Sequence, residues 1–210
     1  MAQPGPRDLA SQFNVSRESL ARLETYVSVL LAWQQRINLI GPSTVGHVWL
    51  RHIGDALQLL PLMPPGVRSI ADLGSGAGVP GLVVAIVTGA NTHLYESNGK
   101  KAAFLREAIR HTSASATVHQ TRIEYLRGNA GRPKVDLVLA RALAPLVSLL
   151  DYAAPFLEAG AIGLFHKGQD IDAELTAATK CWNLVYGIHP SVIDSDGVIL
   201  EVKEAIRVQS

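Results

Sequence analysis

The sequence predicts an α/β fold in which a seven-stranded, mostly parallel sheet with one antiparallel edge strand follows an N-terminal helical extension. Three observations support this prediction. Short apolar runs alternate with helical stretches after Pro61, as in βαβ units. A glycine-rich loop joins the first of these runs to the next helix. Apolar residues make up 48% of the 210 residues, which is enough for one full core.

Residues 1–66 are expected to form the helical extension. Met1–Pro6 holds two prolines and a glycine and is predicted to be a loose tail. Ser16 can cap the helix that follows it, on which apolar side chains recur at helical spacing. These side chains are Leu20, Leu23, Val27, Leu30 and Leu31.

A second helix is predicted over Val48–Leu60, because Pro61 and Pro64-Pro65-Gly66 stop the helical pattern there. His52 and Asp55 lie three residues apart on one face of this helix. They could point at a cleft, but such a pair more often fixes a helix against its neighbour, and we favour that interpretation.

Residues 67–210 are expected to form the α/β domain, in one compact unit with the extension. Strands are predicted over Ser69–Leu73, Thr92–Tyr95, Ala116–His119, Val135–Ala140, Ala161–His166, Asn183–Ile188 and Val198–Lys203. Helices are predicted over Gly81–Val87, Gly99–Arg110, Leu143–Phe156 and Asp170–Thr179. The turn Pro190–Gly197 is too short for a parallel crossover, so the last two strands should form an antiparallel hairpin at the sheet edge. Six parallel strands and one reversed strand are typical of Rossmann-like class I methyltransferases.

The composition excludes several classes of protein. Charged residues make up 18%, which does not fit a disordered acidic or basic chain. The single cysteine, Cys181, excludes a disulfide framework, and the seven histidines show no metal-ligand spacing, so no metal is expected. Apolar runs such as Leu82–Val87 are too short to span a bilayer, and no signal-peptide pattern is present. A cytoplasmic protein without a membrane partner is expected.

Charge is distributed unevenly along the chain. From Lys100 to Arg141, nine basic and three acidic residues give +6, whereas the remainder carries −5. Such asymmetry in a chain of net charge +1 indicates either one basic face or ordinary solvated charges on helices and loops. The sequence leaves both interpretations open.

The loop Asp72–Gly81 is the strongest motif, and it follows an apolar strand and opens a helix. Its glycines fit G-x-G-x-x-G of dinucleotide sites (Gly76, Gly78, Gly81), and also D-x-G-x-G-x-G of S-adenosylmethionine sites (Asp72, Gly74, Gly76, Gly78). The second interpretation is favoured because an acid at the strand end suits the ammonium of S-adenosylmethionine but not a pyrophosphate. Pro80 also disturbs the helix start that would present N–H groups to a pyrophosphate.

Three further residues are candidates for the nucleoside part of a cofactor. Glu96 ends the second strand and can accept hydrogen bonds from both ribose hydroxyls. Both cofactor interpretations predict such an acid. Ile123 and Glu124 follow the third strand, which would place them beside the adenine pocket of a class I methyltransferase.

Four basic residues lie near the expected cleft. Lys101 interrupts the apolar stripe of its helix, so it either reaches solvent at the helix end or serves the cleft. Arg141 follows the fourth strand and Lys167 the fifth, at the carboxyl edge where doubly wound folds bind ligands. Arg141 could instead pair with a nearby acid, and Arg122 could meet a phosphate or face water.

Together these motifs resemble the 16S ribosomal RNA (guanine-N7) methyltransferase G family, also called glucose-inhibited division protein B. The matching residues are Trp33, Asn38-Leu39, His52-Ile53 with Asp55, the loop Asp72–Gly81, the run Glu96-Ser97-Asn98-Gly99-Lys100-Lys101-Ala102-Ala103-Phe104-Leu105-Arg106, Thr121–Glu124, Ala140–Ala142 and Lys167-Gly168. Ala56 departs from the pattern, where a serine usually follows the aspartate. Asp196-Gly197-Val198 also lacks an expected basic residue.

The resemblance implies methyl transfer from S-adenosylmethionine to N7 of one guanine in 16S rRNA, either as free RNA or within the small ribosomal subunit. A monomer is expected. It implies cofactor contacts at Gly74, Val79, Ile123, Glu124 and Arg141, with Glu96 on the ribose. It also implies RNA or guanine contacts for Arg122, Lys101 and Lys167.

Guanine N7 carries an unprotonated lone pair, so this reaction requires no general base, and no catalytic residue is assigned. Catalysis by in-line alignment is expected. Two alternatives stay open on the sequence: a class I methyltransferase acting on a small molecule or protein, and a nucleotide-binding module without catalysis.

Overall fold

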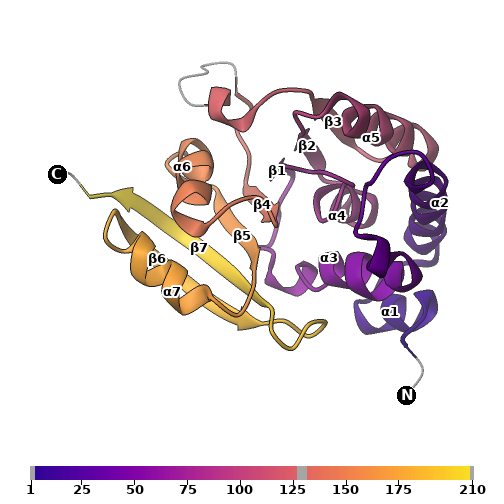
Figure 1. The fold of residues 1–210 in the computed structure, drawn as a ribbon, viewed down its shortest axis with the longest axis horizontal. Helices are drawn as coiled ribbons and strands as arrows, with labels where there is room; N and C mark the ends of the chain where they lie inside the picture. The colour runs from indigo at the N-terminus through magenta and orange to yellow at the C-terminus, as the bar shows by residue number, and fades with distance from the viewer. Residues whose placement is uncertain (1–2, 127–131, 209–210) are drawn as a thin grey trace.

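A computed structural model describes residues 3–126 and 132–208, and Arg127 of the basic stretch lies outside these ranges (Figure 1). The α-helices are α1 (Pro6–Gln12), α2 (Arg17–Gln34), α3 (Asp55–Leu57), α4 (Gly81–Thr88), α5 (Gly99–Thr112), α6 (Leu146–Leu157) and α7 (Ile171–Ala178). The strands are β1 (Ser69–Leu73), β2 (Asn91–Tyr95), β3 (Ala116–His119), β4 (Leu137–Arg141), β5 (Ile162–Lys167), β6 (Trp182–Pro190) and β7 (Val198–Arg207). Every predicted strand is present, and each strand boundary lies within two residues of the predicted one except the end of β7, which extends from Lys203 to Arg207.

The seven strands form one sheet in the order β3-β2-β1-β4-β5-β7-β6. Strands β1 to β5 pair in parallel, whereas β7 is antiparallel to both β5 and β6. The predicted fold class is therefore confirmed. The predicted place of the reversed strand is wrong by one position, because β7 inserts between β5 and β6 and leaves β6 at the edge.

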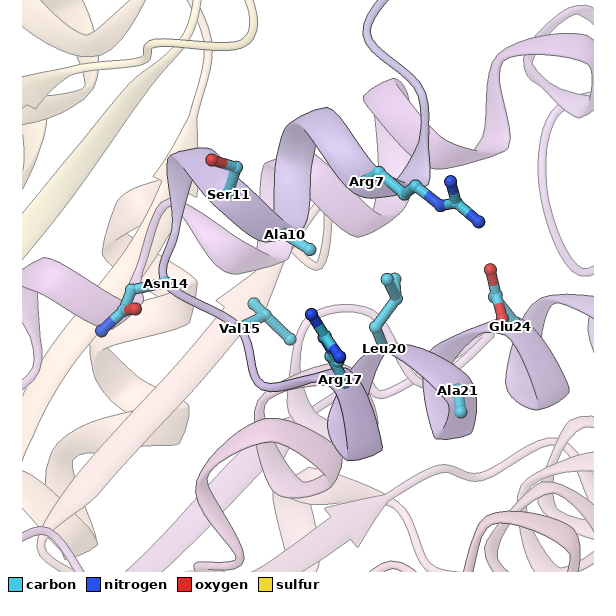
Figure 2. Close-up of a pocket in the computed structure, with 9 residues that line it drawn as sticks. All are labelled: Arg7, Ala10, Ser11, Asn14, Val15, Arg17, Leu20, Ala21 and Glu24. Atoms are coloured by element: carbon cyan, nitrogen blue, oxygen red, sulfur yellow. The ribbon is translucent and has the colours of Figure 1, made fainter.

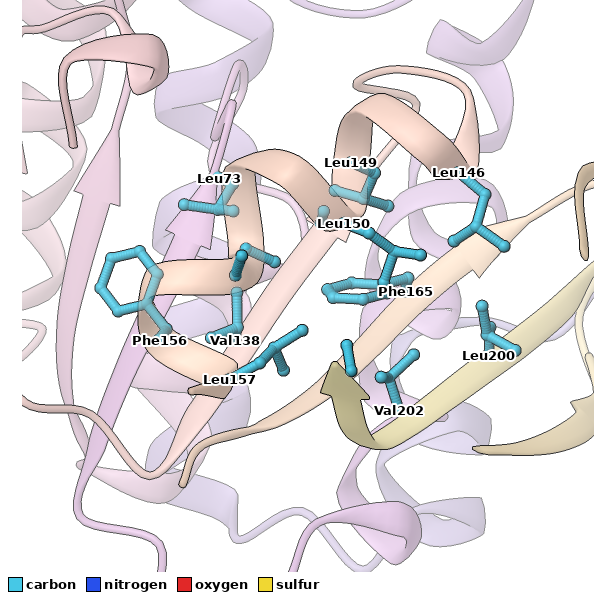
Figure 3. Close-up of a cluster of buried hydrophobic side chains, with 14 of the residues drawn as sticks. Leu73, Val138, Leu146, Leu149, Leu150, Phe156, Leu157, Phe165, Leu200 and Val202 are labelled. Carbon is cyan, nitrogen blue, oxygen red and sulfur yellow. The ribbon is translucent and has the colours of Figure 1, made fainter. Parts of the chain in front are cut away.

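Helices cover both faces of the sheet (Figure 1). On one face, α6 and α7 bury apolar side chains against β4, β5 and β7, including Leu150, Phe165 and Val202 (Figure 3). On the other face, α4 and α5 share a second apolar cluster with the N-terminal helices. Removal of this much apolar surface from water is the main stabilising contribution to the fold.

The chain enters its first helix at the end of the predicted tail Met1–Pro6, of which Met1 and Ala2 lie outside the described residues. Pro6 occupies the first position of α1, a helix that the sequence did not predict, and the Asp8 carboxylate accepts the Gly5 N–H at 2.8 Å. A proline fits there because the first helical N–H groups have no partner within the helix. The expected start of α2 is confirmed, since the Ser16 hydroxyl accepts the Ser19 N–H at 3.1 Å.

The predicted helix Val48–Leu60 is wrong as a single regular helix. A π-helical turn at Trp49–Gly54 leads into the three residues of α3, flanked by 3₁₀ turns at Pro42–His47 and Leu60–Leu62. Gly54 allows close packing here, because a Cβ at this position would lie 3.1 Å from Ile193 Cδ1. Tertiary contacts therefore decide the local backbone.

Polar side chains bind this segment to the loop between β6 and β7. The Gln58 amide oxygen accepts the Ser191 hydroxyl at 3.1 Å and the Val192 N–H at 3.0 Å. Arg51 pairs with Asp194 at 2.7 Å. The N-terminal segment and the last hairpin of the chain are thus fixed to each other beside the carboxyl edge of the sheet.

Candidate active site

The glycine-rich loop leaves β1 at the carboxyl edge of the sheet and leads into α4. Gly74 has a φ of +71°, and a Cβ on it would lie 2.6 Å from Leu143 Cδ1, so no other residue fits without rearrangement. The Ser75 N–H donates to the Tyr95 carbonyl at 3.0 Å, which ties the loop to the end of β2. The loop is therefore held in one conformation by its neighbours.

Glu96, which follows β2, holds the loop from the other side. Its Oε2 accepts the Gly76 N–H at 2.9 Å and its Oε1 accepts the Asn98 N–H at 2.7 Å. The residue is only 8% exposed. A carboxylate has about four acceptor sites, so each oxygen keeps a lone pair for a ligand hydroxyl. This geometry fits the predicted role of Glu96 towards a ribose.

A cavity of about 260 Å³ opens between the loop and the ends of β2 and β3. It brings together seven of the residues predicted from the sequence: Gly74, Gly76, Glu96, Lys101, Arg122, Ile123 and Glu124. The cavity is also lined by four residues that were not predicted: Tyr95, Ser97, Thr121 and Leu143. Ser97 and Thr121 adjoin predicted residues in sequence, whereas only the folded chain brings Leu143 to the loop.

Asp72, the acid predicted to hold an ammonium, is not among the residues that line this cavity. It is buried, and its carboxylate oxygens have no hydrogen-bond partner among the residues that the structure describes. Burial raises its pKa to about 7, although the nearby Ser75 hydroxyl and Gly81 N–H lower it. Its contact with a cofactor ammonium stays a prediction.

Asp72→Asn should change how stability depends on pH. The folded protein binds the extra proton between about pH 4 and about pH 7, so this carboxyl destabilises the fold increasingly as pH rises through that window. The free energy of unfolding of the variant should therefore rise relative to that of the unmodified protein as pH increases across this window, by roughly 4 kcal/mol at most. Urea unfolding at several pH values measures the difference.

The matched control for this prediction is Asp136→Asn. Hydrogen bonds from the Arg68 and Ser69 N–H groups lower the pKa of Asp136, so this carboxylate stabilises the fold. Asp136→Asn should therefore be less stable than the unmodified protein by a constant amount above about pH 4, and this difference should shrink only below about pH 4. A difference between Asp72→Asn and the unmodified protein that stays constant from pH 4 to 7 would show that Asp72 is ionised in the folded state.

Tyr26 on α2 binds the same loop from the N-terminal helices. Its hydroxyl donates to the Ala77 carbonyl at 2.5 Å, and both residues are buried. Burial raises the pKa of this hydroxyl, so it keeps its proton and remains a donor. Predicted residue Val79 is buried in the same apolar cluster as Tyr26, and Gly78 lies between it and Ala77. Gly78 and Val79 thus lie on the side of the loop that packs against the protein.

Arg141, predicted as a cofactor contact, binds the N-terminal segment in this structure. Its Nε lies 2.8 Å from Asp55 Oδ2, and its Nη2 donates to the Arg51 carbonyl at 2.9 Å. Its Nη1 lies 3.1 Å from His52 Nδ1. The expectation that His52 and Asp55 fix their segment against a neighbour is confirmed, and Arg141 is that neighbour.

His52 completes this contact as a neutral imidazole. Burial and, to a smaller extent, the Arg141 charge lower its pKa to about 4. Because Arg141 can only donate, His52 Nδ1 is the acceptor and Nε2 carries the proton towards the Thr44 hydroxyl, 2.8 Å away. Thr44 in turn donates to the Gly41 carbonyl at 2.7 Å.

Lys167 is similarly engaged within the protein. Its side chain is 8% exposed, its Nζ lies 2.5 Å from Glu174 Oε2, and it donates to the Ala144 carbonyl at 3.2 Å. Two smaller cavities, of about 130 and 200 Å³, lie at the ends of β4 and β5. Both are lined by Arg141, Ala142, His166, Lys167 and Gly168. Of the predicted basic residues, Lys101 and Arg122 therefore lie at the cavity beside the glycine-rich loop, whereas Arg141 and Lys167 lie at the ends of β4 and β5.

A larger cavity, of about 740 Å³, lies elsewhere, between α1 and α2 (Figure 2). All its lining residues fall between Arg7 and Glu24, and none belongs to the glycine-rich loop. Within residues 3–126 and 132–208, no group of three or more His, Cys, Asp or Glu side chains could hold a metal ion. The same residues contain no helix that is long and apolar enough to cross a membrane.

The family model for rRNA small subunit methyltransferase G, GidB, matches residues 19–199. The chain belongs to this family. A methyltransferase G relative from Paramagnetospirillum magneticum is 46% identical over 203 residues, covering 97% of both chains. One from Bradyrhizobium diazoefficiens is 49% identical over 197 residues, covering 92% of this chain and 75% of the relative.

Solved structures show the same fold at low sequence identity. The glycopeptide N-methyltransferase MtfA, complexed with S-adenosylmethionine, is 11% identical with a TM-score of 0.59, covering 73% of this chain and 94% of that one. An O-methyltransferase from Bacillus cereus is 16% identical with a TM-score of 0.58, covering 88% and 91%. The predicted family, the methyltransferase fold and enzyme class, and S-adenosylmethionine as co-substrate are confirmed.

Proposed function

We propose that this methyltransferase G family member transfers the methyl group of S-adenosylmethionine to N7 of a specific guanine in 16S rRNA. The observation that carries the proposal is the 46% identity, across 97% of both chains, to a relative named ribosomal RNA small subunit methyltransferase G. The cavity beside the glycine-rich loop supports it, because its residues fit the parts of the co-substrate.

Glu96 would accept the ribose hydroxyls through the lone pairs that its two backbone contacts leave free. Ile123 and Glu124 would adjoin the adenine, and the turns at Gly74 and Gly76 leave room for the methionine part. When bound, S-adenosylmethionine supplies an electrophilic methyl group on its sulfonium. Because Glu96 and Tyr26 already fix the glycine-rich loop, the loop would not need to become ordered when S-adenosylmethionine binds.

No proton has to leave guanine N7 before it attacks, so the protein's contribution is alignment rather than general-base catalysis. Lys101 lines the cavity and can donate a hydrogen bond to guanine O6, as basic side chains do on base edges elsewhere. Arg122 also lines the cavity and can donate to the RNA beside the guanine. The methylated base gains positive charge, so a cation placed too close would oppose the transfer. We therefore assign both residues to positioning.

We further propose that residues 1–66 act as a helical extension of the α/β domain 67–210. The apolar cluster shared by α2, α4 and α5 supports one compact unit. A monomer that acts in the cytoplasm, on free 16S rRNA or on the small ribosomal subunit, is consistent with this arrangement.

The proposed reaction is tested with purified protein, labelled S-adenosylmethionine, and undermethylated small ribosomal subunits beside their naked RNA. We expect label in a single nucleoside, identified as N7-methylguanosine after digestion, and no label with the Glu96→Ala variant. Label on another atom or base would contradict the assigned position. If neither RNA is labelled while S-adenosylmethionine still binds, the enzyme is a methyltransferase of a small molecule or protein.

A further inference from the structure

Tyr125 presents an aromatic ring to solvent beside the candidate active site. It lies on the 3₁₀ turn Ile123–Leu126, next to residues that line the cofactor cavity, and it is 70% exposed. Leu126 is buried in the core, which holds the turn in place. Tyrosine is enriched at interfaces because it combines an apolar ring with a polar hydroxyl, so the ring of Tyr125 is suited to contact a partner.

The ring of Tyr125 borders a second cavity, of about 510 Å³. The cavity is lined by Ser97, Asn98, Gln120, Thr121, Arg122 and Tyr125. Three of these residues, Ser97, Thr121 and Arg122, also line the cofactor cavity, so the two cavities adjoin. Except for Tyr125, every lining residue is polar or charged, which suits a ligand with both a flat base and a polar backbone.

The charges around this second cavity favour an anionic partner. Arg122 lines it, Lys100 and Lys101 adjoin Asn98, and Arg106 reaches Gln120 at 3.3 Å. Lys100, Lys101 and Arg122 form no ion pair with any residue that the structure describes, so their charges remain available. One exposed acid, Glu124, lies on the same turn.

We propose that this cavity binds a single-stranded nucleotide of the RNA substrate beside the target guanine, with its base stacked on Tyr125 and its phosphate near Arg122. The inference rests on the proposed function for the substrate being RNA. Aromatic platforms combined with basic side chains are the general means of holding single strands, because every base has a face that can stack.

The inference is tested by comparing Tyr125→Ala with Tyr186→Ala. Tyr186 lies on β6 and is 42% exposed, so it is a matched exposed tyrosine far from the second cavity. We expect Tyr125→Ala to raise the KM for RNA roughly tenfold, with kcat, S-adenosylmethionine affinity and thermal stability unchanged. Tyr186→Ala should change none of these. An unchanged KM in Tyr125→Ala would overturn the inference, as would a loss of S-adenosylmethionine affinity, which would place the ring on the cofactor.

A second measurement does not depend on methylation. In Tyr125→Trp, an oligoadenylate of about eight nucleotides should quench the fluorescence of the added indole, since a stacked base quenches an indole. The three tryptophans of the unmodified protein give a background that this oligonucleotide should leave unchanged. Arg122→Ala should reduce the salt dependence of this binding by about one counterion. Quenching without any rRNA methylation would remove the proposed function and keep the binding surface. Methylation of rRNA without quenching would keep the proposed function and overturn the binding surface at Tyr125.

Discussion

Arg141→Ala should lower the free energy of unfolding by about 3 kcal/mol, because it leaves the largely buried Asp55 carboxylate without the positive charge that pairs with it and, among the described residues, with only the Gln58 amide as a close donor. Asp55 and Arg141 side chains are 12% and 22% exposed, so water screens their attraction only in part, and the lower end of the usual range applies. The variant also removes donors from the Arg51 carbonyl and His52 Nδ1. Urea unfolding measures the loss.

Two companion variants make this prediction specific. Arg141→Lys keeps the charge but cannot reach three acceptors at once, so it should restore only part of the stability. Arg110→Ala removes an arginine whose pairing with Glu107 is exposed to solvent, and it should change stability little. Full stability together with lost S-adenosylmethionine affinity in Arg141→Ala would show that Arg141 contacts the cofactor, as the sequence predicted.

Glu96→Ala should weaken S-adenosylmethionine binding on the order of a hundredfold. Each hydrogen bond from a ribose hydroxyl to a charged acceptor contributes about 1.5 kcal/mol or more, and two such bonds would be lost. The Gly76 and Asn98 N–H groups would also lose their acceptor, so the loop would be less well fixed. Calorimetry with S-adenosylhomocysteine measures the affinity without turnover.

The control for this variant is Glu107→Ala, an acid on the outer part of α5 that does not line the cavity. It should leave the affinity unchanged. The affinity of Glu96→Gln should lie between those of Glu96→Ala and Glu107→Ala, since one amide oxygen can still accept hydrogen bonds. Unchanged affinity in Glu96→Ala would refute its assignment to the ribose.

The strands and the glycine-rich loop could be predicted because their signals are local. Apolar runs of four to six residues between turn residues identify buried strands wherever the chain then places them. Glu96 could be predicted for the same reason, because a strand end needs no knowledge of distant contacts. The place of β7 between β5 and β6 could not be predicted, because local sequence does not determine which strand of a hairpin pairs with the rest of the sheet.

The partners of Arg141 and the shape of the Trp49–Leu57 region could not be predicted because they depend on distant residues. Arg141 meets Asp55 and His52 only in the folded chain, so its position after β4 indicated a ligand contact instead. Helical propensity alone favoured one regular helix over Val48–Leu60, but packing against Ile193 overrides it. Tyr125 carried no periodic signal, and its exposure became evident only from the structure.

The contacts between Gln58 and the β6–β7 loop also constrain the order of folding. Gln58 and Val192 are 134 residues apart, and Arg51 and Asp194 are 143 apart. Closing a chain loop of that length costs entropy before any contact compensates for it, and such non-local pairings slow folding. During synthesis the N-terminal segment emerges long before its partners, so it cannot reach its final arrangement until the last hairpin has left the ribosome. A nascent chain truncated before residue 190 should therefore retain an accessible, protease-sensitive N-terminal segment.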